Sequence, residues 1–182
     1  MSIPEPPFEA ARTQVVAETA RLILRRLTIE DGAFILGLLN EPSFIEFIGD
    51  RGVRTLEEAQ RYIVENPMAS YARFGFGLYL TTLKGDDAPI GICGLLRRNT
   101  LADVDIGFAM LPAYWGQGYA LESARVVQEH ARRDIGLTRI VAIVSPGNRA
   151  SQALLAKLGF TFENKVKLSP EAPELDLFGC AL

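Results

Sequence analysis

The sequence predicts an α+β fold: a mixed, largely antiparallel sheet of about seven strands with helices on both faces. Three strand-like runs follow one another between residues 74 and 111, which is typical of an antiparallel meander. A helical stretch then leads to an apolar run at 140–144, and such a strand–helix–strand unit indicates one parallel pair. The 182 residues fit a single domain, which we expect at 19–182 after a flexible tail at 1–18.

The first part of the chain predicts one strand and two helices. Arg21–Leu27 has the composition of a strand. Thr28 and Asp31 resemble a helix start, and apolar residues three and four positions apart continue that helix to about residue 40. Thr55 and Glu58 form a better capping box, which predicts a second helix to about residue 66.

The meander comes next. Lys84–Asp87 has hairpin turn chemistry and separates the first two of its strands. These strands are expected at 74–83, 88–98 and 102–111.

The last part of the chain alternates helices and strands. A helix starts after residue 118, carries small apolar residues every three or four positions, and stops near Gly136. Ile140–Val144 is continuously apolar, as expected for a strand buried on both faces. Another helix at 148–158 ends at Gly159. Two terminal strands are expected at 160–167 and 174–181, which completes the order β-α-α-β-β-β-α-β-α-β-β.

Composition excludes several function classes. The net charge is −3 and the arginine pairs are scattered, which is the wrong balance for a nucleic-acid binder. The longest apolar run, Gly32–Leu39, is less than half of the about 18 residues that a membrane span requires. The N-terminus shows no cationic segment leading into an apolar one, so we expect a cytoplasmic protein.

Metal and thiol chemistry are also disfavoured. Cys93 and Cys180 lie in apolar surroundings, and we expect both to be reduced core residues. One histidine and two cysteines cannot supply the four ligands of a structural zinc site. We therefore expect no metal, although a carboxylate-ligated ion stays open.

The segment Trp115–Ala120 carries most of the functional information. Its two glycines lie between a strand and a helix, where the backbone can approach a phosphate group and the first helical N–H groups have no partner. A Walker loop would need Gly-Lys-Ser/Thr where Tyr119 and Ala120 stand. A dinucleotide fingerprint would need a third glycine where Leu121 stands. The remaining alternative is a turn in which the glycines only allow the backbone conformation and no ligand binds.

Trp115–Ala120 resembles the pyrophosphate loop of the GNAT superfamily of acetyl-CoA-dependent N-acetyltransferases, Arg/Gln-x-x-Gly-x-Gly/Ala. Tryptophan in the first place resembles the Rim-type branch, whose members acetylate ribosomal-protein N-termini. The resemblance covers about residues 18–181 and implies the GNAT sheet. Further matches to that branch are Thr19–Arg25 as its opening strand, Asp105–Phe108 as the strand before the loop, and Asn148–Ser151 with Lys157–Phe160 as its last helix.

The resemblance implies acetyl-CoA as a co-substrate. In the family, the strand before the loop splays away from its parallel neighbour, pantetheine pairs with the free backbone groups there, and one N–H faces the thioester oxygen. The asparagine that begins the last helix also holds pantetheine. The implied cofactor-binding residues are Phe108, Ala109, Met110, Leu111, Trp115, Gly116, Gln117, Gly118, Tyr119, Ala120, Asn148 and Ser151.

Two residues are implied for proton transfer. Asp105 matches the family's glutamate base, and because aspartate is shorter and more acidic, a water relay is favoured over direct contact. Asp103 on the same strand face is a second candidate, and a solvated strand carboxylate is the alternative for both. Leu155 stands where many family members carry the tyrosine that acts as the general acid. The resemblance to the Rim-type branch instead implies Ser151 as the acid. The alternative is that Ser151 is a residue of the first helical turn whose hydroxyl only bonds the helix backbone.

The resemblance implies that the acceptor is an amine. Glu46, Asp50, Asp103 and Asp105 would favour a cationic acceptor if they converged. An α-amine with a pKa near 8 is neutral far more often than a lysine near 10.4, a difference of roughly 3 kcal/mol. An aspartate base therefore favours the α-amine of a protein or peptide N-terminus, attacking directly in a ternary complex.

Other functions stay open at this point. The acceptor is alternatively a small molecule such as an antibiotic, an amino acid or a polyamine. With the tyrosine absent, the chain is alternatively an acyl-CoA-binding sensor without turnover, or a nucleotide-binding module. The sequence is compatible with a monomer and with a homodimer.

Overall fold

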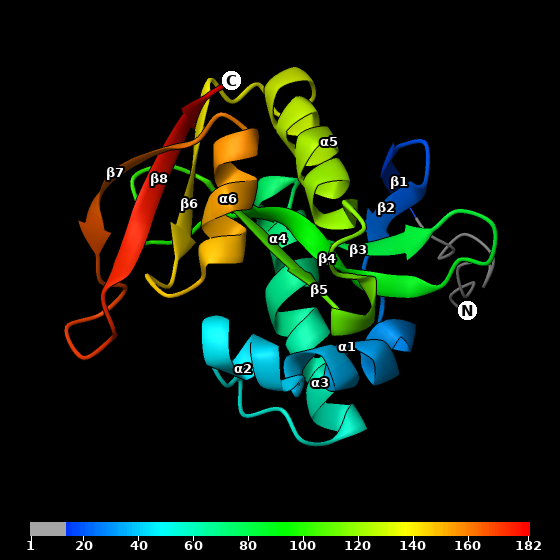
Figure 1. The fold of residues 1–182 in the computed structure, drawn as a ribbon. Helices are drawn as coiled ribbons and strands as arrows, with labels where there is room; N and C mark the ends of the chain where they lie inside the picture. The colour runs from blue at the N-terminus through cyan, green and yellow to red at the C-terminus, as the bar shows by residue number, and fades with distance from the viewer. Residues whose placement is uncertain (1–13) are drawn as a thin grey trace, which may run out of the picture.

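An eight-stranded sheet forms the middle of the computed structural model, which describes residues 14–182 (Figure 1). The strand order is β1-β2-β3-β4-β5-β6-β8-β7, and every neighbouring pair is antiparallel except β5 and β6. The α+β prediction is confirmed, with β8 lying between β6 and β7. The strands are β1 (Val15–Glu18), β2 (Leu22–Arg26), β3 (Leu78–Leu83), β4 (Pro89–Leu96), β5 (Asp105–Met110), β6 (Arg139–Val144), β7 (Thr161–Val166) and β8 (Leu175–Ala181).

The helices follow the predicted order, with additional short elements. The predicted parallel crossover is present, because α5 connects β5 to β6. The helices are α1 (Gly32–Leu39), α2 (Pro42–Phe47), α3 (Leu56–Ile63), α4 (Ala69–Phe74), α5 (Tyr119–Arg133) and α6 (Arg149–Lys157), with short 3₁₀ turns η1 (Ile29–Asp31) and η3 (Pro112–Tyr114) and a π-helical turn η2 (Val64–Met68).

The predicted tail is shorter than expected. Val15–Glu18 form β1, which pairs antiparallel with β2, where the sequence suggested a tail as far as residue 18. The valines of this segment are strand formers, but four residues are too few for a clear alternating pattern. The remainder of the predicted tail, residues 1–13, lies outside the described residues.

The second predicted helix extends beyond residue 66. The capping box at its start is present: the Glu58 N–H donates to the Thr55 hydroxyl and the Thr55 N–H donates to the Glu58 carboxylate. Pro67 does not end the helix, because it lies in the π-helical turn η2, after which α4 continues to Phe74. The first meander strand therefore begins at Leu78, later than predicted.

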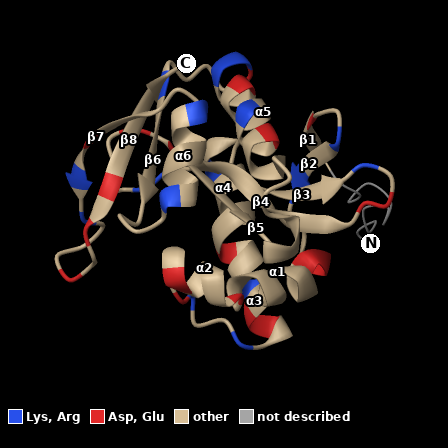
Figure 2. Ribbon diagram, viewed as in Figure 1, with Lys and Arg blue, Asp and Glu red and all other residues tan. Residues whose placement is uncertain are grey.

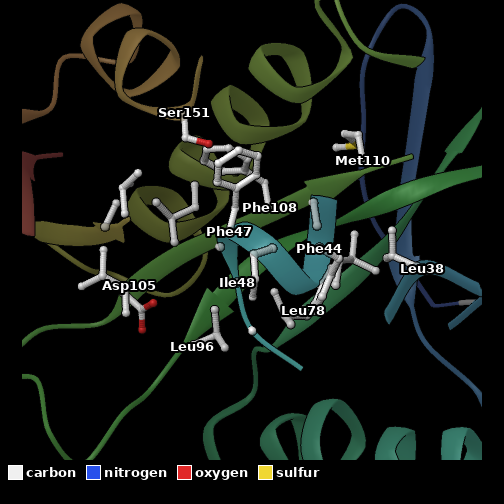
Figure 3. Close-up of a pocket in the computed structure, with 18 of the residues that line it drawn as sticks. Leu38, Phe44, Phe47, Ile48, Leu78, Leu96, Asp105, Phe108, Met110 and Ser151 are labelled. Atoms are coloured by element: carbon white, nitrogen blue, oxygen red, sulfur yellow. The ribbon is translucent and has the colours of Figure 1, made fainter. Parts of the chain in front are cut away.

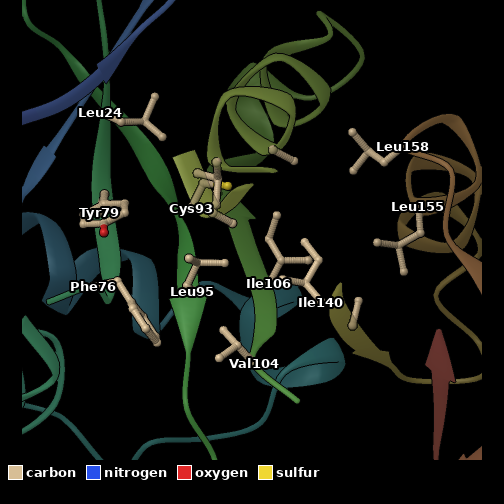
Figure 4. Packing of buried hydrophobic residues seen from close by; sticks show 14 of the residues in the cluster. Leu24, Phe76, Tyr79, Cys93, Leu95, Val104, Ile106, Ile140, Leu155 and Leu158 are labelled. Carbon is tan, nitrogen blue, oxygen red and sulfur yellow. The ribbon is translucent and has the colours of Figure 1, made fainter. Parts of the chain in front are cut away.

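Helices cover both faces of the sheet (Figure 1), and an apolar cluster lies on each face, the first of which is drawn in Figure 4. On one face, Val127 of α5 and Leu155 of α6 pack against strand residues such as Ile106 and Ile140. On the other face, α1, α2 and α3 pack against Leu80 and Ile92. Both cysteines are free thiols, as predicted. Cys93 lies fully buried in the first cluster, whereas Cys180 on β8 is only partly buried, so the prediction of a core residue holds for Cys93 and not for Cys180.

The sheet opens between β5 and β6. Asp105 and Val141 are the one residue pair by which these parallel strands are joined, and the Val141 N–H donates to the Val104 carbonyl over 3.0 Å. Beyond that pair the strands separate. Since the Leu111 N–H bonds to Ile90 on β4, alternation along β5 turns the N–H and C=O of Phe108 toward the gap.

Charges of both signs are interspersed over the molecule. In Figure 2, basic and acidic segments alternate along α5. None of the helices within residues 14–182 has the length and apolarity of a membrane-spanning helix.

Candidate active site

A cleft of about 1870 Å³ continues from the gap between β5 and β6 across the molecule. Its first half is lined by β5, by the loop that precedes α5 and by the start of α6. Its second half is lined by α2, α3 and the residues that follow each of them, together with the β4–β5 turn. We call the first part the loop half and the second the open half. Figure 3 shows Phe108 and Ser151 among the residues that line the cleft, and Asp105 with its carboxylate turned toward Leu96.

The segment Trp115–Ala120 forms a glycine turn followed directly by α5. Gly116 has φ +73° and Gly118, the residue before the helix, has φ +83°. Both are left-handed conformations that other residues adopt at a cost. A Cβ on Gly116 would meet no atom within 4 Å, so the turn presents open backbone. The first N–H groups of α5 point outward from it without intrahelical partners, as an anion-binding helix start requires.

The turn between β1 and β2 holds this glycine turn in place. Arg21 donates from Nη1 to the Gln117 carbonyl over 3.0 Å and from Nε to Glu122 over 2.7 Å. The same guanidinium lies 4.4 Å from the centroid of the Tyr119 ring. Thr19 also donates its hydroxyl to Glu122. Arg21 thus fixes the middle of the loop relative to the first turn of α5, a role that its place in a strand-like run did not reveal.

The sequence predicts cofactor contacts through the backbone of all four residues Phe108–Leu111. In the structure, fewer of these residues turn their backbone groups toward the gap. Alternation directs the N–H and C=O of Ala109 and Leu111 toward β4, while Phe108 and Met110 face the gap. The Met110 carbonyl accepts a 2.8 Å hydrogen bond from the Trp115 indole, so that carbonyl is already satisfied. Phe108 is therefore the residue whose N–H and C=O are both presented to the gap.

Asn148 and Ser151 lie together at the start of α6. Asn148 is the N-cap, as predicted, because its side-chain oxygen accepts the Ser151 N–H over 3.0 Å. Ser151 is half-buried and lines the cleft. Among residues 14–182 its hydroxyl makes no hydrogen bond, which leaves the hydroxyl available to a ligand.

Asp105 is a buried carboxylate. Its side chain is 1% exposed, and both of its oxygens accept from Arg98 Nε over 3.1 Å. Burial raises the pKa of the Asp105 carboxyl above its ordinary value, and the Arg98 guanidinium opposes that rise. Asp103 is different, because it pairs with Arg139 on the surface and does not line the cleft. Of the two candidate bases, Asp105 alone lies at the site.

Within the described chain no three histidine, cysteine, aspartate or glutamate side chains lie close enough together to hold a metal ion. Residues 21–161 match the family model described as an acetyltransferase (GNAT) domain, and this match covers more than half of the chain.

The chain belongs to the GNAT acetyltransferases.

Relatives of known sequence are similar along most of this GNAT chain. The N-acetyltransferase YoaA of Bacillus subtilis, described as uncharacterized, is 29% identical over 154 residues, which cover 84% of this chain and 86% of the relative. An FsC-acetyl coenzyme A-N(2)-transacetylase of Aspergillus fumigatus is 27% identical over 173 residues, covering 90% of this chain and 74% of the relative.

Solved GNAT structures show the same fold. RimL, a ribosomal L7/L12 α-N-protein acetyltransferase, superposes with a TM-score of 0.80 at 17% identity and with 99% of each chain covered. An acetyltransferase of Agrobacterium tumefaciens superposes with a TM-score of 0.77 at 24% identity, covering 100% of this chain and 96% of the other.

GNAT acetyltransferases use acetyl-CoA, and RimL has also been solved in complex with coenzyme A. The residues of this chain fit that co-substrate. Gly116 leaves open space where a pyrophosphate meets backbone N–H groups, and the gap beside Phe108 offers an unpaired N–H and C=O for the amide-bearing pantetheine arm. The chain is thus an acetyl-CoA-dependent N-acetyltransferase of GNAT type.

We expect the Arg21 brace to act on acetyl-CoA binding. Arg21→Ala frees the Gln117 carbonyl and Glu122, so the loop must be ordered when the co-substrate binds. The KM for acetyl-CoA should rise about 10-fold, the scale of lost charge-assisted hydrogen bonds, with an unchanged KM for the acceptor. Steady-state kinetics with each substrate varied separately measure both. Lys84→Ala removes another surface cation as a control, and an equal rise in both KM values would contradict the brace.

Asp105→Asn tests the base through pH dependence. A base acts when deprotonated, so we expect wild-type activity to fall as the pH drops through the raised pKa of Asp105. The variant should lose about 10²-fold in kcat/KM at low pH and recover as the pH approaches the amine's own pKa near 8. Asp105→Glu keeps the partner of Arg98 and serves as the control. A loss that is uniform across pH would instead assign Asp105 a purely structural role.

Proposed function

We propose that this acetyltransferase transfers the acetyl group to the α-amine of a protein or peptide N-terminus in the cytoplasm, by direct attack in a ternary complex. The observation that carries the proposal is the continuity of the cleft, which places the open half next to Phe108 and Ser151. An acceptor can therefore enter from the side opposite the loop half while acetyl-CoA occupies the loop half.

The open half presents apolar surface to an acceptor. Ile45 and Ile48 line it and are 37% and 42% exposed, so apolar surface is available to an incoming chain. Leu168 and Pro173, from the segment between β7 and β8, line the cleft as well. Such a surface favours a peptide over a compact amine that is enclosed on all sides.

The proposed reaction uses groups that meet in the cleft. The amine nitrogen attacks the thioester carbonyl carbon, and the Phe108 N–H stabilises the negative charge that develops on the carbonyl oxygen. The C–N bond forms and the C–S bond breaks. The amine's proton passes to Asp105 through a chain of water molecules, and the leaving thiolate takes a proton from Ser151. Ser151 then regains a proton from water, and Asp105 releases its proton to solvent, which restores both groups for the next cycle.

A small amine is the second candidate acceptor. Its support is that the Aspergillus relative is named for N(2)-transacetylation of FsC and not of a protein N-terminus. RimL, by contrast, is named for acetylation of a protein α-amine.

A panel of amines separates the two candidates. Peptides with free and blocked N-termini, lysine side-chain mimics, amino acids, polyamines and aminoglycosides are each incubated with acetyl-CoA while released thiol is measured. We expect thiol release with free N-terminal peptides and none with their N-blocked forms. Turnover confined to small amines would refute the peptide proposal, and coenzyme A binding without turnover on any amine would indicate a sensor.

A further inference from the structure

Three of the four carboxylates that the sequence offers to a cationic acceptor are paired with arginines. Asp50 pairs with Arg54, Asp103 pairs with Arg139 outside the cleft, and Asp105 pairs with Arg98. The sequence left open whether these acidic groups converge with Glu46; of the four, Glu46 and Asp105 line the cleft, and Asp50 and Asp103 do not. A cationic acceptor in the cleft would find Asp105 already held by a guanidinium group.

Two arginines of the open half retain binding capacity. Arg98 uses only its Nε for Asp105, so both of its terminal nitrogens keep their donors. Arg51, in the loop between α2 and α3, makes no ion pair or hydrogen bond with any residue of 14–182 and lines the same cleft. An arginine fork without a carboxylate is suited to bind one from a ligand.

Tyr62 lies with these arginines. It is half-buried on α3, lines the cleft, and its hydroxyl makes no hydrogen bond within the described residues. Burial raises the pKa of the Tyr62 phenol, whereas the nearby charges of Arg51 and Arg98 oppose the rise. No acidic group acts on this phenol in the same way. The hydroxyl is thus a neutral donor in the same cleft as two cationic donors.

Other charged residues line the open half of the cleft as well, the cations among them being Arg61, Arg73 and Arg97. Glu41 and Glu46 belong to the α2 segment, and Glu65 follows α3. The Glu58 carboxylate is engaged by the N–H groups of Arg54 and Thr55. None of these four forms an ion pair with Arg51 or Arg98, so none satisfies the arginine donors that face the cleft.

From this geometry we infer that Arg51, Tyr62 and Arg98 form a carboxylate subsite for the acceptor. The inference rests on the proposed function and specifies its substrate class: a peptide with an acidic side chain close to its free N-terminus. Arg51 and Arg98 bind the carboxylate through their donors, and the Tyr62 hydroxyl donates a further hydrogen bond.

The length of β5 indicates where the acidic residue belongs. Asp105, which holds Arg98, and Phe108, where the amine reacts, are three residues apart on one strand, or about 10 Å. The carboxylate of a free amino acid is separated from its amine by a single carbon and is too close to reach both points. In an extended peptide, the side chain of the second or third residue spans such a distance.

The test compares acidic peptides with their amide analogues. Matched peptides carry Asp or Asn at position two, or Glu or Gln at position three, and free glutamate provides the amino-acid arm. We expect wild-type kcat/KM to favour the acidic member of each pair by about 10-fold or more, the scale of hydrogen bonds to charged groups. Arg51→Gln and Tyr62→Phe should reduce that preference and leave the rate on the amide peptides unchanged, and Arg51→Glu should shift the preference to peptides with Lys at these positions.

Arg54→Gln is the matched control. It removes a cation from the same loop, but Arg54 is held by Asp50 and does not line the cleft, so the acidic preference should persist. Equal rates on acidic and amide peptides, or a preference that survives Arg51→Gln, would overturn the subsite while leaving peptide acetylation intact. If the panel shows turnover only with small amines, the proposed function fails instead. Binding of the same peptide pairs in the presence of coenzyme A then decides the subsite independently of turnover.

Discussion

Replacing Ser151 by alanine lowers kcat by about 10- to 10⁴-fold at saturating acetyl-CoA, the range of general acid catalysis and its weaker forms. The expectation follows from the Ser151 hydroxyl, which lines the cleft and makes no hydrogen bond within the described residues. Helix α6 does not depend on that hydroxyl, since its N-cap bond uses the Ser151 N–H and the Asn148 side chain. Fold and co-substrate affinity should therefore remain, and kcat alone should fall.

Ser151→Thr keeps a hydroxyl at the same position and is the matched control, with activity expected to return at least in part. Calorimetric affinity for coenzyme A and thiol-release kinetics together separate chemistry from binding. A Ser151→Ala enzyme with wild-type kcat would remove the serine from the mechanism. Water would then serve as the acid, because a thiol with a pKa near that of cysteine, about 8.5, is a tolerable leaving group.

Gly118→Val should reduce acetyl-CoA affinity by about 100-fold or more, because the change lies in the loop that would bind the pyrophosphate. This corresponds to a loss of about 2.8 kcal/mol in binding free energy, at about 1.4 kcal/mol for each factor of ten. Gly118 has φ +83°, and its Cβ would lie 3.5 Å from Arg21 Nη2, so a branched side chain displaces both backbone and brace. The strain of a left-handed valine costs about 1–3 kcal/mol of stability, which a folded domain tolerates.

Gly136→Val separates strain from binding. Gly136 has φ +78°, follows α5 and does not line the cleft, so valine there imposes a similar backbone cost away from the loop. The two variants should show similar decreases in melting temperature, and only Gly118→Val should lose affinity for coenzyme A in titration calorimetry. Unchanged affinity for coenzyme A in a folded Gly118→Val protein would show that the loop connects β5 to α5 without binding the co-substrate.

Most of the fold could be predicted because its signals are local. The capping box at Thr55 and the apolar run at Ile140–Val144 each specify an element through neighbouring residues. The helix beyond residue 66 could not be predicted, because Pro67 normally ends a helix and only the tertiary structure accommodates it in a π-helical turn. Helix α2 was missed because its six residues give too short a pattern.

The candidate site divides in the same way. The glycine loop and the Asn148 cap are short motifs with local meaning, so their positions could be predicted. The Arg98–Asp105 pair depends on the geometry of the β4–β5 turn, which spacing alone does not determine. Arg51 and Tyr62 come from a loop and a helix whose packing against β5 is a tertiary property. No sequence pattern links them.

The single link between β5 and β6 makes the sheet two separate units of local unfolding. Opening the β6–β8–β7 part breaks one ladder pair and the packing of α5 and α6, while the hydrogen bonds inside each part are retained. A ligand that spans the gap adds its binding free energy to the cost of that opening. Amide hydrogens of β7 and β8, far from the glycine loop, should therefore exchange more slowly once coenzyme A is bound.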